Sequence, residues 1–516
     1  MFIPQDNRYT LEWFKARGAS DHTRKPAARV TLRKHQKEGS NAIVSAHSSG
    51  LPGFLLADDV GLGKTYTIID AVCALAKLSK KPLNVLVISP LSVVPHWKHS
   101  LNDYGTTNTF WCVTNYDILK NFLSEPSVAK TAKKVRTRNK RVSKYGLSKH
   151  NWDIVICDES HRLKNPVSQR TRCVQRLVST NRSGVKSVPA FTIWASATAG
   201  QNPLDLSYLA RLFAARTHTK ASTLANYETW CQANNLGVSK GKFGKWEYAP
   251  NDADYERVRS LLFDEFTFKT HTSICSLRRK PSMIASWPEI SRQSMPVELT
   301  TKNFKAYQLA WETFLKEMSI VNKSKGKDSK NAMVVALRFR QKASILRAQS
   351  TALAIKDSIA EGYRPAVSVQ FYDSIDAIVS FLPKTFKVGV IDGRVSAKNR
   401  ETIRTNFQKG KLDCILFSVT EGISLHANSD SMHADTTPRM LLIHDLRWSA
   451  LDMAQIEGRT HRDGQAAVAY YMYSEYTVEE KMVNSVLSKL KTMGDMLGDD
   501  TTALDALLEE CLRASA

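Results

Sequence analysis

The stretch from Phe54 to Thr65 has the residue types and spacing to bind a nucleotide phosphate. Apolar residues 54–57 predict a short buried strand, and glycines at positions 61 and 63 precede Lys64 and Thr65. Helix-spaced apolar residues then predict that the loop opens a helix, whose N-terminal N–H groups attract anions. In such a loop the lysine reaches the β- and γ-phosphates and the threonine hydroxyl ligates Mg²⁺. The alternative is a glycine-rich turn with an exposed lysine, because position 58 is Asp where the usual pattern has Gly.

A second stretch places two carboxylates directly after an apolar run. Residues 154–157 predict a buried strand that ends at Asp158 and Glu159. Ligands of open α/β sheets bind at the carboxyl ends of the strands. We expect Asp158 to hold Mg²⁺ through water, and Glu159 to orient and deprotonate an attacking water. Such a pair is mostly structural when it occurs alone, but downstream of a phosphate loop it indicates a hydrolytic site.

These two stretches need a parallel sheet to bring them together. Apolar runs alternate with helical patterns in both halves of the chain, which is typical of parallel sheets covered by helices. The predicted strands are 54–57, 84–89, 153–157, 190–195, 366–371, 387–391, 413–417 and 440–444. We therefore predict two α/β lobes, residues 1–288 and 289–516. Prolines at 281, 288 and 296 indicate a hinge between them.

Two segments have the composition of insertions, and an amphipathic helix is predicted near the end of the chain. Residues 127–152 contain nine Lys or Arg and no acid, so phosphate contact is at least as plausible as a solvated face. Residues 323–330 are mixed in charge and predict a flexible loop. Thr477 and Glu480 predict a capping box that opens the final helix.

The charge balance of the whole chain points to a polyanionic partner. The 516 residues include 73 Lys plus Arg against 49 Asp plus Glu, a net charge of +24, and nucleic acid is the commonest polyanion. No apolar stretch approaches membrane-spanning length, and no signal-peptide pattern is present, so no membrane role is expected. The eight cysteines form no Cys-x-x-Cys pair, which argues against zinc and disulfides and favours a reducing intracellular compartment.

Several motifs of the first half resemble those of helicase superfamily two, and are closest to the Swi/Snf DNA translocases. The phosphate loop of that family usually reads Asp-Glu-x-Gly-Leu-Gly-Lys-Thr, which resembles residues 58–65 and accounts for the aspartate. Asp-Glu-Ser-His at 158–161 resembles the family's second motif. Residues 32–39 resemble the segment whose glutamine reads adenine, which implies that role for Gln36.

The second half matches in the same order and ends in a specific signature. Residues 455–465 are similar to the family pattern Gln-x-x-Gly-Arg-x-His-Arg-x-Gly-Gln. Arg459 and Arg462 are three apart and share a face if the segment is helical. Two guanidinium groups aimed across a cleft can neutralise charge that develops on a γ-phosphate. We expect these two arginines to complete the site from the second lobe.

The resemblance implies an α/β fold of two RecA-like lobes, each a mostly parallel sheet flanked by helices, with the basic insertion in the first lobe and a C-terminal helix. It also implies a DNA-dependent ATPase that uses ATP and Mg²⁺ and tracks along double-stranded DNA through backbone phosphates. The predicted catalytic residues are Lys64, Asp158, Glu159, Arg459 and Arg462. The predicted nucleotide contacts are Gln36, Asp58, Gly61, Leu62, Gly63, Lys64, Thr65 and Gln455, and the predicted Mg²⁺ ligands are Thr65 and Asp158.

Three other functions stay open. Residues 195–198 read Ala-Ser-Ala-Thr rather than the family's Leu-Thr-Gly-Thr, which favours a strand-separating DNA or RNA helicase. The chain could also be the motor subunit of a restriction or repair complex, or a non-catalytic nucleic-acid-binding scaffold. The short architecture favours the cytoplasm of a bacterium or a phage-infected cell, although Lys133 to Arg141 reads equally well as a nuclear import signal.

Overall fold

The computed structural model describes most of the chain in two compact units. The described residues are 19–20, 30–124, 146, 148–178, 181–182, 185–186, 190–197, 199–200, 202–217, 224–241, 244–249, 251–259, 275–280, 283–284, 291–323, 329–419, 423–427, 435–461 and 467–497. The division between unit 1 and unit 2 falls after Ile284. The predicted boundary after residue 288 lies outside the described residues, as does most of the basic segment 127–152.

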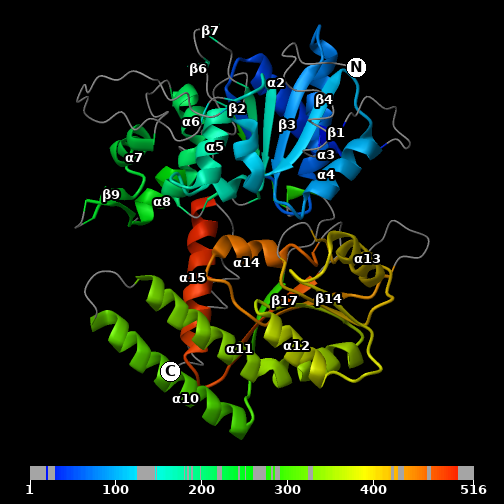
Figure 1. Ribbon diagram of the computed structural model, residues 1–516, viewed down its shortest axis with the longest axis vertical. Helices are drawn as coiled ribbons and strands as arrows, with labels where there is room; N and C mark the ends of the chain where they lie inside the picture. The colour runs from blue at the N-terminus through cyan, green and yellow to red at the C-terminus, as the bar shows by residue number, and fades with distance from the viewer. Residues whose placement is uncertain are drawn as a thin grey trace. The chain divides into compact units, whose positions relative to one another are not determined.

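Unit 1 is built on a seven-stranded sheet in the order β1-β4-β3-β5-β8-β2-β11. All neighbouring strands are parallel except β1, which runs antiparallel to β4. The strands are β1 (Ala19–Ser20), β2 (Gly53–Leu56), β3 (Leu83–Ser89), β4 (Thr109–Asn115), β5 (Ile154–Asp158), β8 (Phe191–Ala195) and β11 (Ser276–Leu277). Every residue of β2, β5 and β8 is buried, because helices cover both faces of a parallel sheet (Figure 1).

Helices connect these strands, as parallel pairing requires. They are α2 (Lys34–Ser48), α3 (Lys64–Leu78), α4 (Val94–Tyr104), η1 (Tyr116–Phe122), η2 (Ser160–Leu163), α5 (Gln169–Leu177), η3 (Pro203–Leu209), α6 (Ala210–Thr217), α7 (Leu224–Ala233) and α8 (Asp252–Arg259). Two small hairpins, β6 (Asn181–Arg182) with β7 (Val185–Lys186) and β9 (Val238–Lys240) with β10 (Trp246–Tyr248), stand apart from the main sheet. Ile68, Ile69 and Val72 of α3 pack with strand residues in one core, so this helix is fixed against the sheet.

Unit 2 contains a six-stranded, fully parallel sheet in the order β12-β17-β16-β13-β15-β14. The strands are β12 (Ser291–Val297), β13 (Arg364–Ser368), β14 (Val388–Ile391), β15 (Cys414–Phe417), β16 (Arg439–Ile443) and β17 (Ala467–Ser474). The helices are α10 (Thr301–Lys323), α11 (Ser329–Ala360), α12 (Tyr372–Phe381), α13 (Ala397–Gln408), α14 (Ala450–Glu457) and α15 (Glu479–Leu497). The long helices α10 and α11 lie side by side (Figure 1), and Tyr307, Phe339 and Ala343 form a small core between them.

The fold class predicted from the sequence is confirmed, because each unit holds a mostly parallel sheet flanked by helices. Each of the eight predicted strands coincides with a strand of the structure to within three residues at either end. The C-terminal helix is also confirmed, with Val483, Val486 and Leu487 buried. The predicted capping box differs in detail, since Glu480 accepts from the Tyr476 amide (2.6 Å) and the Thr477 hydroxyl accepts from the Glu479 amide (3.2 Å).

The predicted hinge is partly wrong. Pro296 lies in β12, which pairs in parallel with β17 over seven residues. Because β12 is an edge strand, its proline can point away from the ladder without losing a hydrogen bond. Of the loop predicted at 323–330, residues 324–328 lie outside the described residues and Ser329 already begins α11. None of the described helices is long and apolar enough to cross a membrane.

The close packing at Gly53, the first residue of β2, yields a prediction about stability. A β-carbon at Gly53 would lie 2.2 Å from the Thr192 carbonyl oxygen and 2.5 Å from the Trp194 ring. Gly53→Ala should therefore lower the free energy of unfolding of unit 1 by about 2 kcal/mol. Denaturant unfolding checks this, with Leu78→Ala at an exposed helix end as the control that changes little. Equal midpoints for the two variants would contradict the packing described.

Candidate functional site

The loop between β2 and α3 has the shape of an anion-binding cradle. Gly61 and Gly63 have φ angles of 95° and 78°, which favour glycine. A β-carbon at Gly63 would lie 2.1 Å from the side-chain nitrogen of Gln36, so a larger residue there would displace the Gln36 amide. Helix α3 begins at Lys64, and its N-cap Gly63 has no side chain to satisfy the first-turn N–H groups. These groups are oriented as anion-binding helix termini are.

Lys64 folds over the beginning of its own loop. Its ammonium nitrogen donates to the carbonyl oxygens of Asp58 (2.7 Å) and Asp59 (3.2 Å). Burial lowers the pKa of Lys64, while the nearby carboxylates of Glu159, Asp58 and Asp158 act in the opposite direction. The lysine therefore stands within electrostatic reach of both carboxylates of the second stretch.

The sheet register explains how that proximity arises. Leu56, the last residue of β2, pairs with Ala195 of β8, and Ala195 pairs in turn with Asp158, the last residue of β5. The phosphate loop and the Asp158–Glu159 pair therefore leave the same edge of the sheet, separated only by β8. This is the carboxyl edge, where open α/β sheets bind their ligands.

Asp158 is buried but keeps the capacity to bind a cation. One of its carboxylate oxygens accepts from the indole N–H of Trp97 (2.7 Å) and the other from the backbone N–H of Glu159 (3.0 Å). Burial, followed by the charge of Glu159, raises the pKa of Asp158 to about 7, and the Trp97 hydrogen bond and Lys64 oppose the rise. Each oxygen accepts one bond and retains a further acceptor position.

Glu159 has a backbone conformation that is uncommon for a residue other than glycine. Its φ is 50°, in the left-handed region, a strain that is concentrated at functional sites. One carboxylate oxygen lies 3.4 Å from His161 Nδ1, and the same nitrogen lies 3.0 Å from the Ser196 hydroxyl. His161 thus links the end of β5 to the end of β8. Thr198, the last residue of the Ala-Ser-Ala-Thr stretch at 195–198, lies outside the described residues.

Gln36 lies directly on the phosphate loop. Its Nε2 donates to the Leu62 carbonyl (3.4 Å), and its Oε1 accepts from the Arg33 backbone N–H at the start of α2 (2.9 Å). His35 also contacts the Leu62 carbonyl, at 3.0 Å. The structure therefore brings together Gln36, Gly61, Leu62, Gly63, Lys64, Thr65, Asp158 and Glu159 within unit 1.

Asp58 has a partner that sequence reasoning missed. Its fully buried carboxylate accepts from the backbone N–H (3.0 Å), Nε (2.9 Å) and Nη2 of Arg279, and Arg279 Nη1 donates to the His35 carbonyl. The sequence separation is 221 residues, so only the tertiary fold reveals the pair. The direct nucleotide contact predicted for Asp58 stays a prediction.

The predicted residues of unit 2 occupy the end of α14 and the turn after it. Gln455 lies on α14 and is buried. The helix ends at Glu457 because Gly458 follows, so Arg459 lies in the turn and the helical face expected for the two arginines is wrong for it. The Arg459 side chain is buried, and its Nη1 donates to the Ile423 carbonyl (3.1 Å). Arg462 lies outside the described residues.

The residues of unit 1 fit a nucleoside triphosphate with its magnesium ion. The loop offers two glycines with positive φ, an open helix N-terminus and a lysine, which together suit phosphate oxygens. The Thr65 hydroxyl and a carboxylate oxygen of Asp158 are hard oxygen donors of the kind that Mg²⁺ prefers, and Mg²⁺ commonly takes few protein ligands beside phosphates.

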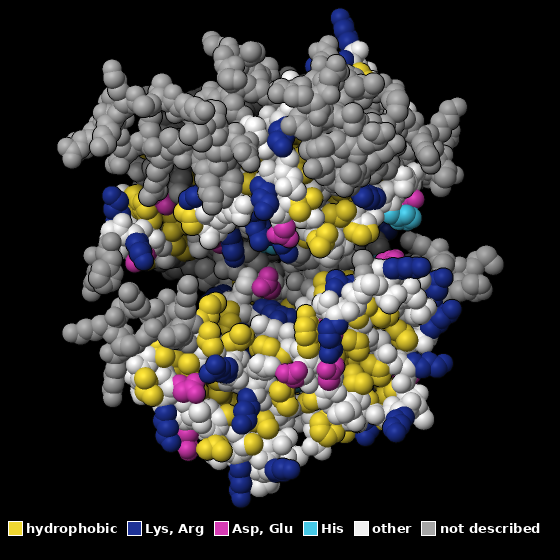
Figure 2. Space-filling view, in the orientation of Figure 1, with side chains coloured by type: hydrophobic (Ala, Val, Ile, Leu, Met, Phe, Trp, Pro, Cys, Tyr) yellow, Lys and Arg dark blue, Asp and Glu magenta, His cyan; other side chains and the backbone are white. Residues whose placement is uncertain are grey.

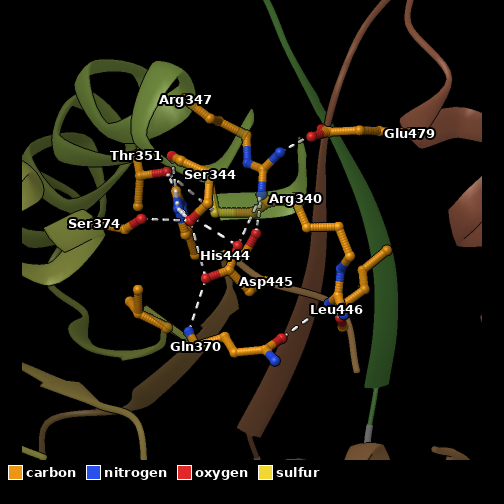
Figure 3. Close-up of polar contacts among 12 residues, drawn as sticks. Arg340, Ser344, Arg347, Thr351, Gln370, Ser374, His444, Asp445, Leu446 and Glu479 are labelled. Atoms are coloured by element: carbon orange, nitrogen blue, oxygen red, sulfur yellow. Dashed lines mark hydrogen bonds and ion pairs between the residues drawn. The ribbon is translucent and has the colours of Figure 1, made fainter. Parts of the chain in front are cut away.

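A buried polar network holds the carboxyl edge of the unit 2 sheet (Figure 3). Arg347 of α11 pairs with Asp445 (3.5 Å) after β16 and with Glu479 of α15. Asp445 also accepts from the Ser344 hydroxyl (3.0 Å) and from the Gln370 backbone N–H (2.7 Å). The network therefore ties α11 and α15 to the segments that follow β13 and β16.

Comparison with known families identifies the chain. The SNF2-related domain family matches residues 35–348, more than half of the chain, and the helicase conserved C-terminal domain matches residues 346–464. The two matches define the class of protein as one that joins an SNF2-related domain to a helicase conserved C-terminal domain. Within that class, the chain belongs to the SNF2-related family, which confirms the resemblance drawn from the motifs.

The individual proteins to which the chain is similar share less than a third of its residues over the aligned regions. An uncharacterized ATP-dependent helicase of Mycoplasma genitalium is 23% identical over 93% of this chain and 43% of its own length. The ISWI chromatin-remodeling complex ATPase ISW1 of Saccharomyces cerevisiae is 32% identical over 31% of this chain and 14% of its own. The chain thus spans less than half the length of these relatives. The Sulfolobus solfataricus SWI2/SNF2 ATPase core in complex with dsDNA aligns over 96% of this chain and 99% of that one, at 20% identity and a TM-score of 0.36.

The buried histidine of the unit 2 network yields a prediction about pH. Burial lowers the pKa of His444 to about 4, and its Nδ1 contacts the Thr351 hydroxyl at 2.7 Å. An unfolded histidine takes up its proton near pH 6.5, so the unfolded state binds more protons between pH 6.5 and 4. The stability of unit 2 should therefore fall by up to about 3 kcal/mol as the pH drops through that window.

Amide hydrogen exchange of peptides from β13 and β16 measures this change. His444→Gln should flatten the pH dependence between 6.5 and 4, whereas His99→Gln, an exposed histidine on α4, should leave it as it is. An unchanged slope in His444→Gln would contradict the assignment of a buried neutral histidine.

Proposed function

We propose that the chain hydrolyses ATP and uses the energy to move along double-stranded DNA. The observation that carries the proposal is the arrangement at one sheet edge, where the loop that bears Lys64 and the Asp158–Glu159 pair leave the ends of β2 and β5, separated only by β8. A cationic phosphate cradle beside two carboxylates is what hydrolysis of a phosphoanhydride requires. Membership of the SNF2-related family supports the same reaction.

In the proposed reaction each side chain of unit 1 has a separate role. The first-turn N–H groups of α3 bind the phosphates, and Lys64 exchanges its bonds to the Asp58 and Asp59 carbonyls for β- and γ-phosphate oxygens. Thr65 and Asp158 would hold Mg²⁺, and the ion would supply positive charge that neutralises charge developing on the phosphate. Glu159 accepts the proton of the attacking water, and His161 restrains the Glu159 carboxylate at 3.4 Å.

Unit 2 completes the site in this proposal. Arg459 and Arg462 supply positive charge to the γ-phosphate as arginine fingers do, and Gln455 adds a polar contact. Arg459 would have to exchange its bond to the Ile423 carbonyl for a phosphate oxygen. Closing around ATP and reopening after hydrolysis would then move the two units relative to each other, which is the stroke of the motor.

Double-stranded DNA is the proposed track. The net charge of +24 suits a polyanion, and the ISWI relative is named a chromatin-remodeling ATPase. On the face drawn in Figure 2, Lys and Arg side chains are spread over the described surface of both units and do not form one patch. Lys and Arg side chains that contact DNA through its backbone phosphates hold the duplex without recognising its base sequence.

Glu159→Gln tests the proposed chemistry. The amide cannot accept the proton, so hydrolysis should fall at least about a hundredfold while ATP binding persists. Turnover and nucleotide affinity are measured in parallel, with exposed Glu312→Gln on α10 as the matched control. Lys64→Ala should lose binding as well. Full turnover in Glu159→Gln would overturn its assignment as the base.

The track is tested by measuring ATPase activity with duplex DNA, single-stranded DNA, RNA or no nucleic acid. We expect the largest stimulation from duplex DNA. The logarithm of the duplex affinity should fall with the logarithm of salt concentration at a slope of about −0.9 per phosphate contact. Absence of stimulation by all three nucleic acids would refute a nucleic-acid motor.

A strand-separating helicase is the second candidate. Ser196, which lies 3.0 Å from His161 Nδ1, belongs to the Ala-Ser-Ala-Thr stretch at 195–198 in which this chain departs from the family's Leu-Thr-Gly-Thr. A triplex-displacement assay separates the two functions, because a translocase releases the third strand and leaves the duplex paired. Unwinding of the duplex itself would favour the helicase.

A further inference from the structure

The aspartate that replaces the first glycine of the phosphate loop carries a buried ion pair. The Asp58 side chain is fully buried and accepts three hydrogen bonds from Arg279. Two come from the guanidinium and are charge-assisted, and the third comes from the Arg279 backbone N–H. A buried carboxylate is retained only when a partner compensates its charge. The two residues therefore depend on each other.

The guanidinium of Arg279 also binds the helix that carries Gln36. Its Nη1 donates to the His35 carbonyl, one residue before Gln36. A β-carbon at Gly39 would lie 2.7 Å from Arg279 Nη2, so α2 packs directly against the guanidinium. A displacement of Arg279 would therefore shift the part of α2 that carries Gln36, the residue predicted to contact adenine.

The backbone around Arg279 continues the sheet alongside the loop. The N–H of Ala57 donates to the Leu277 carbonyl (2.7 Å) and the N–H of Asp59 to the Arg279 carbonyl (3.0 Å). The carbonyls of Asp58 and Asp59 are the two groups that hold Lys64. Arg279 is therefore bonded to the same short segment that restrains the catalytic lysine.

We propose that Arg279 is a positioning residue of the nucleotide site. Through its pair with Asp58 and its bond to the His35 carbonyl, it fixes the position of the phosphate loop relative to α2, the helix that carries Gln36. The inference rests on the proposed ATP-binding function and adds to it a residue outside the motifs. In this role Arg279 acts through Asp58, His35 and the backbone of the loop. Lysine cannot replace it, because a single ammonium cannot bond bidentately to Asp58 and also reach the His35 carbonyl.

Arg279→Lys and Asp58→Asn test the proposal by separating nucleotide selectivity from folding. Each variant should raise the KM for ATP about tenfold, since the loop and Gln36 lose their common anchor. The preference for ATP over GTP should fall toward that of Gln36→Ala. The Arg279→Lys/Gln36→Ala double variant should lose no more selectivity than Gln36→Ala alone, because both changes act through one unit.

The matched control is Arg364→Lys in unit 2. Arg364 begins β13 and pairs with the largely buried Asp435 at 2.7 Å, and Asp435 also accepts from Arg439, which is not assigned to nucleotide. It should lower the melting temperature to a similar extent and leave the KM and the ATP/GTP ratio unchanged. Duplex DNA affinity should stay the same in all variants.

The outcomes are distinguishable. Loss of melting temperature in Arg279→Lys with an unchanged ATP/GTP ratio would overturn the proposal and make the pair structural only. Wild-type levels of KM and selectivity in both Arg279→Lys and Asp58→Asn would overturn it as well. Failure of the unaltered protein to bind ATP or GTP would instead refute the proposed function on which the inference rests.

Discussion

The parallel pairing of β2 with β8 and of β8 with β5 is the constraint on which the rest of the site depends. It brings Leu56 and Asp158, about a hundred residues apart in sequence, to the same sheet edge. A parallel strand must return through a crossover, so the loop after each strand emerges at one edge. The phosphate loop and the carboxylates lie close together there because the backbone hydrogen bonds between β2, β8 and β5 fix the ends of these strands side by side.

Charge in this site is stabilised by mutual compensation. Burial disfavours the charged forms of Lys64 and Asp158, and the attraction between the two groups opposes that effect in each case. Lys64 is held by carbonyl oxygens and not by a carboxylate, so it can exchange them for phosphate oxygens without separating an ion pair. The only carboxylate inside the described loop that is fully buried, Asp58, is already neutralised by Arg279.

The sequence predicted the core strands well, and what it missed has physical causes. β2, β5 and β8 are continuous apolar runs because both of their faces are buried, which makes them easy to recognise. β12 cannot be recognised in the same way, because an edge strand with half-exposed residues and a proline has no continuous apolar run. Arg279 could not be assigned, since its partners lie 221 and 244 residues away and no local motif encodes that pairing.

Each unit contains a buried arginine, Arg279 in unit 1 and Arg347 in unit 2, and the two side chains are stabilised by different sets of partners. Arg279 in unit 1 bridges a loop and a helix, whereas Arg347 in unit 2 bridges two helices and a strand end through Asp445 and Glu479. Breaking either arrangement by removing one partner leaves an uncompensated charge, which costs more than the pair contributes. Each arginine is therefore costly to displace, and each lies at the carboxyl edge of its own sheet.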